Sequence, residues 1–256
     1  MPNIAHLYYE ESGQGPSVIF IHCPALSHVY WSPVIDRMKS ACRCIALDLR
    51  GHGRSGLGER PWHFADIAAD LHLLTRTLGL DHPVLVGYSA GGSIAMEAAL
   101  QEPTLYGGLV LVSAFSEGSG LFFRAKVGLG LSLVKLGLTR YIGPDIIRTN
   151  SCGPDHIRAM LPDAQSVRPT ALASYLRETL HYRCTNQLRQ IDLPVLLVYG
   201  GSDEVMHRFY KTLQRGFRHA RAHFFPKTDH RVPTRHPVEF GEAVTQFILE
   251  INRPPV

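Results

Sequence analysis

A serine at position 89 lies in the pattern Gly-x-Ser-x-Gly, between an apolar run and a helical pattern. At a strand-to-helix turn this pattern lifts the serine hydroxyl out of a sheet. The two glycines are needed because larger side chains would clash with the adjoining strand and helix. The N–H of Ala90 would then lie at a helix N-terminus, where negative charge is favoured. The pattern predicts that Ser89 is a nucleophile and that Ala90 is an oxyanion donor.

A serine nucleophile needs a general base, and the base needs a group that orients it. Asp203 follows the apolar run 194–200, and His230 follows the apolar run 222–226. If both runs are strands of one parallel sheet, these side chains lie at the same carboxyl edge as Ser89. The sequence therefore predicts a triad of Ser89, His230 and Asp203. Asp203 could instead cap the helix that follows it.

Residues 20–28, FIHCPALSH, are expected to form a strand that breaks into a loop at Cys23 and Pro24. Proline has no backbone N–H, so it is an unexpected residue in a loop that would point N–H groups at a substrate. We expect His22, at the strand end, to brace this loop rather than to act as the base. The residues expected at the substrate pocket are His22, Cys23, Tyr88, Phe122 and Phe123.

Short apolar runs alternate with longer amphipathic stretches along most of the chain. Continuous β-branched runs bounded by glycine or proline are typical of strands buried on both faces of a parallel sheet. The predicted strands are 17–22, 43–48, 83–87, 108–113, 194–200 and 222–226. The predicted helices are 31–40, 63–78, 89–101, 204–219 and 237–251. This alternation predicts an α/β fold with helices on both faces of the sheet.

One interval, 115–190, contains no convincing strand. It holds a Gly- and Leu-rich amphipathic stretch, 120–143, and two polar helical stretches, 155–161 and 170–185. We expect a helical cap over the carboxyl edge of the sheet, inserted into a core made of residues 1–114 and 191–256. The alternative is that these helices belong to the same layer as the others.

The composition is that of an ordinary globular protein, with 256 residues, 45% hydrophobic and 19% charged. A net charge of +4 is too small and too dispersed to indicate nucleic-acid binding. The five cysteines have irregular spacings, which favours reduced thiols over disulfides or a zinc site. No signal peptide or transmembrane run is visible, so we expect a cytoplasmic protein without stable membrane insertion. An oligomer is possible.

The chain resembles the α/β-hydrolases. The resemblance rests on four features: His22 at a strand end, the run Asp48-Leu-Arg-Gly-His-Gly-Arg-Ser55, the Gly-x-Ser-x-Gly pattern, and the order Ser89, Asp203, His230. It implies an eight-stranded, mostly parallel sheet with a helical lid. It also implies that Ser89 is the nucleophile, His230 the base and acid, and Asp203 the orienter. No metal or organic cofactor is implied.

The sequence departs from the family pattern at two places. The family usually has Gly-x-Gly before the catalytic histidine, whereas this chain has Lys227-Thr-Asp before His230, with a carboxylate that we expect to face solvent. In the family's His-Gly-x loop, the residue after the glycine gives the second oxyanion N–H. That residue is Pro24 here. Ala25 could donate through a shift of one residue, a side chain or water could substitute, or Ala90 could act alone.

The sequence thus predicts a serine hydrolase that cleaves a carboxylic ester, thioester or lactone through an acyl-enzyme. Carbon–carbon bond hydrolysis, amide hydrolysis and cofactor-free perhydrolysis on the same triad remain open, because fold and triad do not choose among them. A small-molecule receptor with little turnover is the alternative that Pro24 favours. The apolar stretch 120–143 suggests a hydrophobic substrate, or it only packs the cap onto the core. Its glycines and few cations argue against an interfacial anchor.

Overall fold

The computed structural model describes residues 3–4, 6–57 and 62–252. Residues 1–2, 5, 58–61 and 253–256, all in the predicted core, lie outside the described ranges. The described strands are β1 (Asn3–Ile4), β2 (Leu7–Ser12), β3 (Ser17–Ile21), β4 (Arg43–Leu47), β5 (Val84–Tyr88), β6 (Gly108–Val112), β7 (Val195–Gly200) and β8 (Ala220–Phe225). They form one sheet in the order β1-β2-β4-β3-β5-β6-β7-β8. Each of the six strands β4, β3, β5, β6, β7 and β8 pairs in parallel with its neighbour in this list. Strand β2 pairs antiparallel with both β1 and β4.

The central strands are buried on both faces, as their continuous apolar runs predict. Every residue of β5, β6 and β7 is buried. The predicted α/β fold with an eight-stranded, mostly parallel sheet is confirmed. Strand β2 is not among the runs identified in the sequence, because only its first half is buried and its glutamates face outward.

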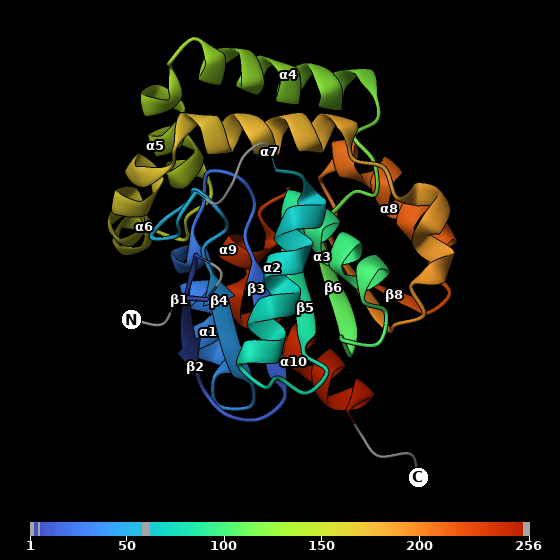
Figure 1. Ribbon diagram of the computed structural model, residues 1–256. Coiled ribbons are helices and arrows are strands. Elements are labelled where there is room, and N and C mark those ends of the chain that lie inside the picture. The colour runs from blue at the N-terminus through green and yellow to red at the C-terminus, as the bar shows by residue number, and fades with distance from the viewer. Residues whose placement is uncertain (1–2, 5, 58–61, 253–256) are drawn as a thin grey trace.

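Helices cover both faces of this sheet (Figure 1). One face packs against α2 (Phe64–Thr77), α3 (Ala90–Gln101) and α8 (Glu204–Gly216). The other packs against α1 (Ser32–Met38) and α10 (Pro237–Ile251). Three short helices complete this part of the fold: the 3₁₀ helices η1 (His28–Trp31) and η2 (Thr185–Gln190), and α9 (Val232–Arg235). No helix in the described ranges combines the length and hydropathy needed to cross a bilayer.

Four further helices lie between β6 and β7 in the chain: α4 (Leu121–Lys135), α5 (Thr139–Thr149), α6 (Pro154–Ser166) and α7 (Pro169–His181). We call them the helical layer. In Figure 1 the layer lies above the end of the sheet where β5 leads into α3, and α4 is its outermost helix. Helix α7 lies between α4 and the sheet, and it makes the main packing contact of α4.

Candidate active site

Ser89 lies on a strained turn between β5 and α3. Its φ of 55° and ψ of −119° are in a region that residues other than glycine rarely adopt. The turn is held by a hydrogen bond of 2.8 Å from the Ser89 N–H to the carbonyl of Val112. A Cβ atom at Gly91 would collide with the carbonyl of Ile21, so glycine lets α3 begin directly beside β3. The Ser89 side chain therefore projects at the carboxyl edge of the sheet.

Asp203 and His230 contact each other across two loops. His230 Nδ1 lies 2.8 Å from Asp203 Oδ2, and the exposed fractions of the two side chains are 33% and 10%. Asp203 occupies the N-cap position of α8, but its side chain makes no capping hydrogen bond. The carboxylate is thus directed to the histidine rather than to the helix that it precedes.

The loops after β7 and β8 hold this pair in place. The Ser202 N–H donates to the carbonyl of Thr228 at 2.9 Å, and the Gly201 N–H donates to the carbonyl of Phe225 at 2.8 Å. A Cβ atom at Gly200 would collide with the carbonyls of Thr228 and Asp229, so glycine permits this close approach. The two loops therefore form one hydrogen-bonded unit beneath Asp203 and His230.

Asp229, the unusual carboxylate beside His230, is paired with a cation. Its side chain accepts hydrogen bonds from Arg231, including 2.9 Å from Nε to Oδ1. This hydrogen bond and the arginine charge lower the pKa of Asp229 to about 2, despite partial burial. Arg231 also donates to the carbonyl of Thr149 at 2.9 Å, at the end of α5. Asp229 thus takes part in a link between the His230 loop and the helical layer.

A cavity of about 360 Å³ contains the predicted catalytic residues. Ser89, Ala90, Asp203 and His230 all line it. Most of its remaining lining is apolar and comes from the helical layer, α8 and the loop after β6, including Phe115, Phe123, Val127, Ile146, Leu176 and Met206. The cavity therefore offers an apolar wall opposite a serine, a histidine and a carboxylate.

Three of the five expected pocket residues, Cys23, Phe122 and Phe123, line this cavity, whereas His22 and Tyr88 do not. His22 is fully buried. Its Nε2 accepts the N–H of Leu49 at 3.0 Å, so the proton lies on Nδ1, which is 2.8 Å from the carbonyl of Cys23. Burial lowers the pKa of His22 to about 3, with a further contribution from His52. The neutral ring thus joins the loop after β3 to the loop after β4.

Tyr88 lies behind the predicted catalytic residues rather than in the cavity. Its ring stacks on Tyr30 with a centroid distance of 5.0 Å, on the side of the sheet that faces α1 and α10. Its ring centroid is also 5.2 Å from that of His230. The Tyr88 hydroxyl donates to Asn150 Oδ1 at 3.1 Å, just after α5. Tyr88 thus contacts His230 on one side and the residue that follows α5 on the other.

The loop after β3 forms a tight turn with Pro24 and Ala25 at its centre. The Leu26 N–H lies 3.3 Å from the carbonyl of Cys23, and Ala25 has a φ of 68°. Proline followed by a positive φ is typical of a type II turn, in which glycine is the usual residue at the Ala25 position. Pro24 lines the cavity of Ser89.

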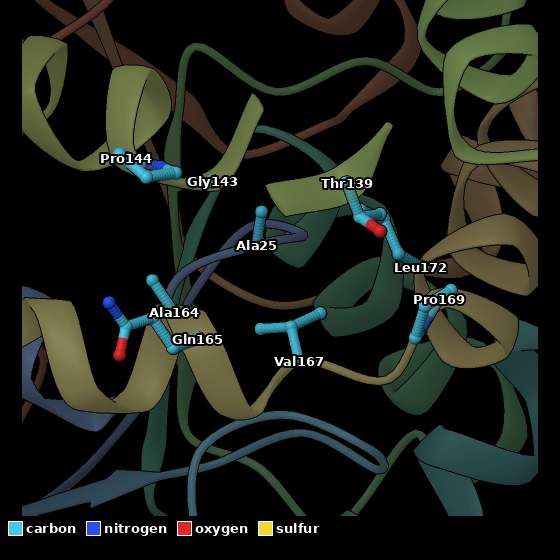
Figure 2. Close-up of a pocket in the computed structure, with 9 residues that line it drawn as sticks. All are labelled: Ala25, Thr139, Gly143, Pro144, Ala164, Gln165, Val167, Pro169 and Leu172. Atoms are coloured by element: carbon cyan, nitrogen blue, oxygen red, sulfur yellow. The ribbon is translucent and has the colours of Figure 1, made fainter. Parts of the chain in front are cut away.

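Ala25 lines a different cavity, of about 370 Å³, beneath the helical layer. In Figure 2, Ala25 lies between residues of α5, α6 and α7, including Pro144, Ala164 and Leu172. Pro24, and not Ala25, is therefore the residue of this turn that lines the Ser89 cavity, and the second oxyanion donor stays a prediction.

Asp48 organises the loops beneath this region. Its Oδ1 accepts the N–H of His28 at 2.7 Å and lies 2.8 Å from His28 Nδ1, and its Oδ2 accepts the N–H of Arg54 at 2.9 Å. Burial opposes charge on both partners. Their hydrogen bond and the surrounding charges together outweigh this effect, so the pKa of His28 is raised and that of Asp48 is lowered.

Among the described residues, His28, Asp48 and Asp163 form one group whose potential ligand atoms lie within 4.8 Å of one another. These are the residues that could hold a metal ion. The group also has a structural role: His28 and Asp48 are hydrogen-bonded to each other, and Asp163 Oδ2, on α6 of the helical layer, lies 3.8 Å from His28 Nδ1.

Several cavity residues were not predicted from the sequence. Ile146, Leu176 and Met206 lie on helices whose apolar positions equally fit packing against a core. No sequence signal separates the two roles. The apolar character of 120–143 was noted, and this stretch supplies Lys126, Val127 and Gly130 to the cavity.

Similar proteins share this fold. Residues 18–243 match the model of the alpha/beta hydrolase family. An uncharacterized protein of Mycobacterium tuberculosis is 29% identical over 76% of this chain, which spans 64% of that protein's length. A pimeloyl-[acyl-carrier protein] methyl ester esterase of Aeromonas hydrophila is 24% identical, covering 93% of this chain and 98% of that protein.

Among solved structures, an esterase from Exiguobacterium antarcticum superimposes with a TM-score of 0.87 at 17% identity, covering 97% of this chain and 100% of the esterase. The family match covers most of the chain, and this superposition extends over nearly all of it. The chain belongs to the alpha/beta hydrolase family.

Proposed function

We propose that this protein is a serine hydrolase that cleaves a carboxylic ester, thioester or lactone. The observation that carries the proposal is the 2.8 Å contact between His230 Nδ1 and Asp203 Oδ2 in the cavity that Ser89 also lines. A carboxylate that accepts a hydrogen bond from Nδ1–H keeps the proton on Nδ1, which leaves Nε2 free to accept a proton from a serine hydroxyl. The strained backbone at Ser89 further supports the role of nucleophile.

In the proposed reaction, Ser89 Oγ attacks the substrate carbonyl while His230 Nε2 takes the serine proton. His230 then gives this proton to the leaving alcohol or thiol, which departs as the tetrahedral intermediate collapses to an acyl-enzyme. Water attacks the acyl-enzyme while His230 takes one of its protons. His230 then gives this proton to Ser89 Oγ as the second tetrahedral intermediate collapses and the acid is released. Asp203 orients the imidazole and stabilises its protonated form in both halves of the reaction.

The Ala90 N–H, at the start of α3, is the proposed donor to the oxyanion. Pro24 lines the cavity where the family's second donor is expected, and it has no N–H. Ala25 lines the other cavity. This arrangement favours a hole with one backbone donor, and losing one donor slows a serine hydrolase by about 10²–10³ in kcat. We therefore propose a slow enzyme rather than an inactive one.

The apolar wall of the cavity supports an acyl or ring substrate with a hydrophobic part, with the helical layer acting as a cap. The ester cleaved by the similar Aeromonas esterase supports an ester over an amide. A hydrolase-fold receptor is the second candidate, because Pro24 leaves the oxyanion hole with fewer donors.

Steady-state hydrolysis of p-nitrophenyl esters from two to twelve carbons tests the proposal. We expect turnover by the wild type and none by Ser89→Ala. We expect kcat/KM to rise by up to about fourfold for each added methylene until the cavity is full, since a buried methylene contributes about 0.8 kcal/mol. A single slow acylation without steady-state turnover at every chain length would contradict the hydrolase proposal and favour the receptor.

A further inference from the structure

The outermost helix, α4, has an apolar face that no described residue covers. Leu121, Phe122, Leu129 and Leu136 are 89%, 68%, 62% and 72% exposed. They are the four most exposed large hydrophobic side chains in the described ranges, followed by Leu73 at 47%. Figure 1 shows α4 on the outside of the helical layer, supported from below by α7. Such a concentration of exposed apolar side chains marks an interaction surface.

The exposed side chains form one continuous stripe. Leu121, Ala125, Leu129, Ser132 and Leu136 recur three or four residues apart, which places them on one side of a helix. All five are exposed, and Phe122 lies beside them. We call these six residues the outer stripe.

Cations border the outer stripe, and acidic residues are missing from this part of the sequence. No Asp or Glu occurs between Glu117 and Asp145. At 100° per residue, Lys126 lies on one side of the stripe, and Arg124 and Lys135 lie on the other. All three are exposed. The face is therefore apolar along its centre and positive along both edges.

We infer that the outer stripe docks on an anionic lipid surface. A helix with leucine and phenylalanine on one side and lysine and arginine at the edges adsorbs to such a surface, with its apolar side chains below the headgroups. A second copy of this chain fits less well, because pairing α4 with α4 would bring the same cations together. The helix would lie in the plane of the interface without crossing it. Such docking revises the expectation from the sequence, in which the glycines and few cations of this stretch argue against an interfacial anchor. The glycines at 128 and 130 leave the outer stripe continuous, and the three cations of α4 lie along its edges.

Docking would bring the Ser89 cavity close to the lipid. Phe123, Val127 and Gly130, on the side of α4 opposite the outer stripe, line that cavity, and Phe122 and Lys126, at one edge of the stripe, line it as well. A helix is about 10 Å across, so a docked molecule would hold the cavity about one helix diameter from the surface. Adsorption itself does not require the catalytic residues, and the inference goes beyond the proposed function.

Flotation with extruded vesicles tests this inference. The vesicles are phosphatidylcholine alone, or phosphatidylcholine with about a third phosphatidylglycerol, in low salt. We expect wild-type protein and Ser89→Ala to float equally with the anionic vesicles.

The triple variant Leu121→Ser/Leu129→Ser/Leu136→Ser should lower the partition coefficient at least about tenfold. Lys135→Glu should lower it about tenfold on anionic vesicles only. Raising the salt to 0.5 M should weaken wild-type binding, because salt screens the charges.

The matched control is Leu73→Ser/Leu249→Ser, which replaces exposed leucines on the core helices α2 and α10. This control should float like the wild type. The triple serine variant should still hydrolyse a soluble short ester, which separates a failure of docking from a failure of catalysis. Absence of wild-type flotation, or equal loss in the control, overturns the inference. So does a dimer, detected by light scattering, that dissociates in the triple variant, because a second copy would then occupy the face.

Discussion

His230 Nδ1 lies 2.8 Å from Asp203 Oδ2, and the two residues come from loops that follow neighbouring strands, β7 and β8. The contact is possible because the loops are hydrogen-bonded to each other and because Gly200 lets the His230 loop approach β7. Its consequence is a fixed imidazole at the cavity that contains Ser89. Chemistry at this site therefore depends on the orientation of one ring.

Asp203→Asn should abolish most of the activity without unfolding the protein. An amide at this position favours the wrong histidine tautomer, which lowers kcat by about 10⁴ in a serine protease triad. Ester hydrolysis at saturating substrate measures the effect, with circular dichroism to confirm folding. The matched control is Glu204→Gln, the exposed carboxylate next in the chain, which should retain wild-type kcat. Equal losses in both variants would show that Asp203 has no special role.

Pro24→Ala should make the enzyme faster. The substitution gives an N–H to a residue that already lines the Ser89 cavity. A second oxyanion donor is worth about 10²–10³ in kcat when its geometry is ideal, and we expect at least about tenfold here. The measurement is kcat for a short ester, with Ala25→Gly as a control that should give no comparable gain. Unchanged or lower kcat in Pro24→Ala would mean that another group already completes the hole.

Ser89→Gly should be more stable than Ser89→Ala. Both variants lose the hydroxyl, but only glycine adopts a φ of 55° with a ψ of −119° without strain. Strain at such a residue costs about 1–3 kcal/mol, and the greater freedom of glycine in the unfolded chain offsets about 0.5–1 kcal/mol of that. We expect a difference in unfolding free energy of about 1 kcal/mol by urea denaturation. Equal stabilities would indicate that the turn stores no strain.

The His28–Asp48 pair should make stability depend on pH. Burial opposes charge on His28, but Asp48, Glu10 and Asp163 raise its pKa above 6.5. Because the pKa of His28 is higher in the folded than in the unfolded state, protonated His28 stabilises the folded state. This contribution is fully present below pH 6.5 and is lost as the pH rises through the folded pKa. The wild type should therefore lose its advantage in unfolding free energy over His28→Asn as the pH rises above about 6.5 and through the raised pKa of folded His28.

The same pair acts in the opposite direction at low pH. Despite burial, the hydrogen bond to His28 lowers the pKa of Asp48 below 3.8, so its contribution is present above that pH and is lost as the pH falls through the folded pKa. Urea unfolding of the wild type, His28→Asn and His72→Asn across this range measures both effects. His72 is a buried histidine on α2 that lacks such an acidic partner, and burial lowers its pKa. A constant difference between the wild type and His28→Asn at every pH would contradict the prediction.

The sequence predicts the central sheet well because strands such as β5 and β6 are continuous apolar runs. It misses β2, since only three of its residues are clearly apolar and it pairs at the antiparallel side of the sheet. The positions of Ser89, Asp203 and His230 follow from strand ends, which the runs define.

Side-chain direction is harder to predict. Tyr88 is adjacent to Ser89 in sequence, yet its ring points to the other side of the sheet. His22 is at a strand end like Asp203, but its ring bonds to Leu49 and not to a substrate cavity. The outward orientation of Leu129 also depends on which face of α4 packs against α7, and the sequence does not specify that choice.

Labelling with a fluorophosphonate followed by intact-mass measurement tests the central claim most directly. The reagent phosphonylates a serine whose proton is taken by a neighbouring base. We predict one adduct per chain in the wild type, none in Ser89→Ala, and labelling in His230→Ala slower by at least about 10³-fold. A wild type that takes up no label, or an adduct that persists in Ser89→Ala, would contradict the assignment of Ser89 as the nucleophile.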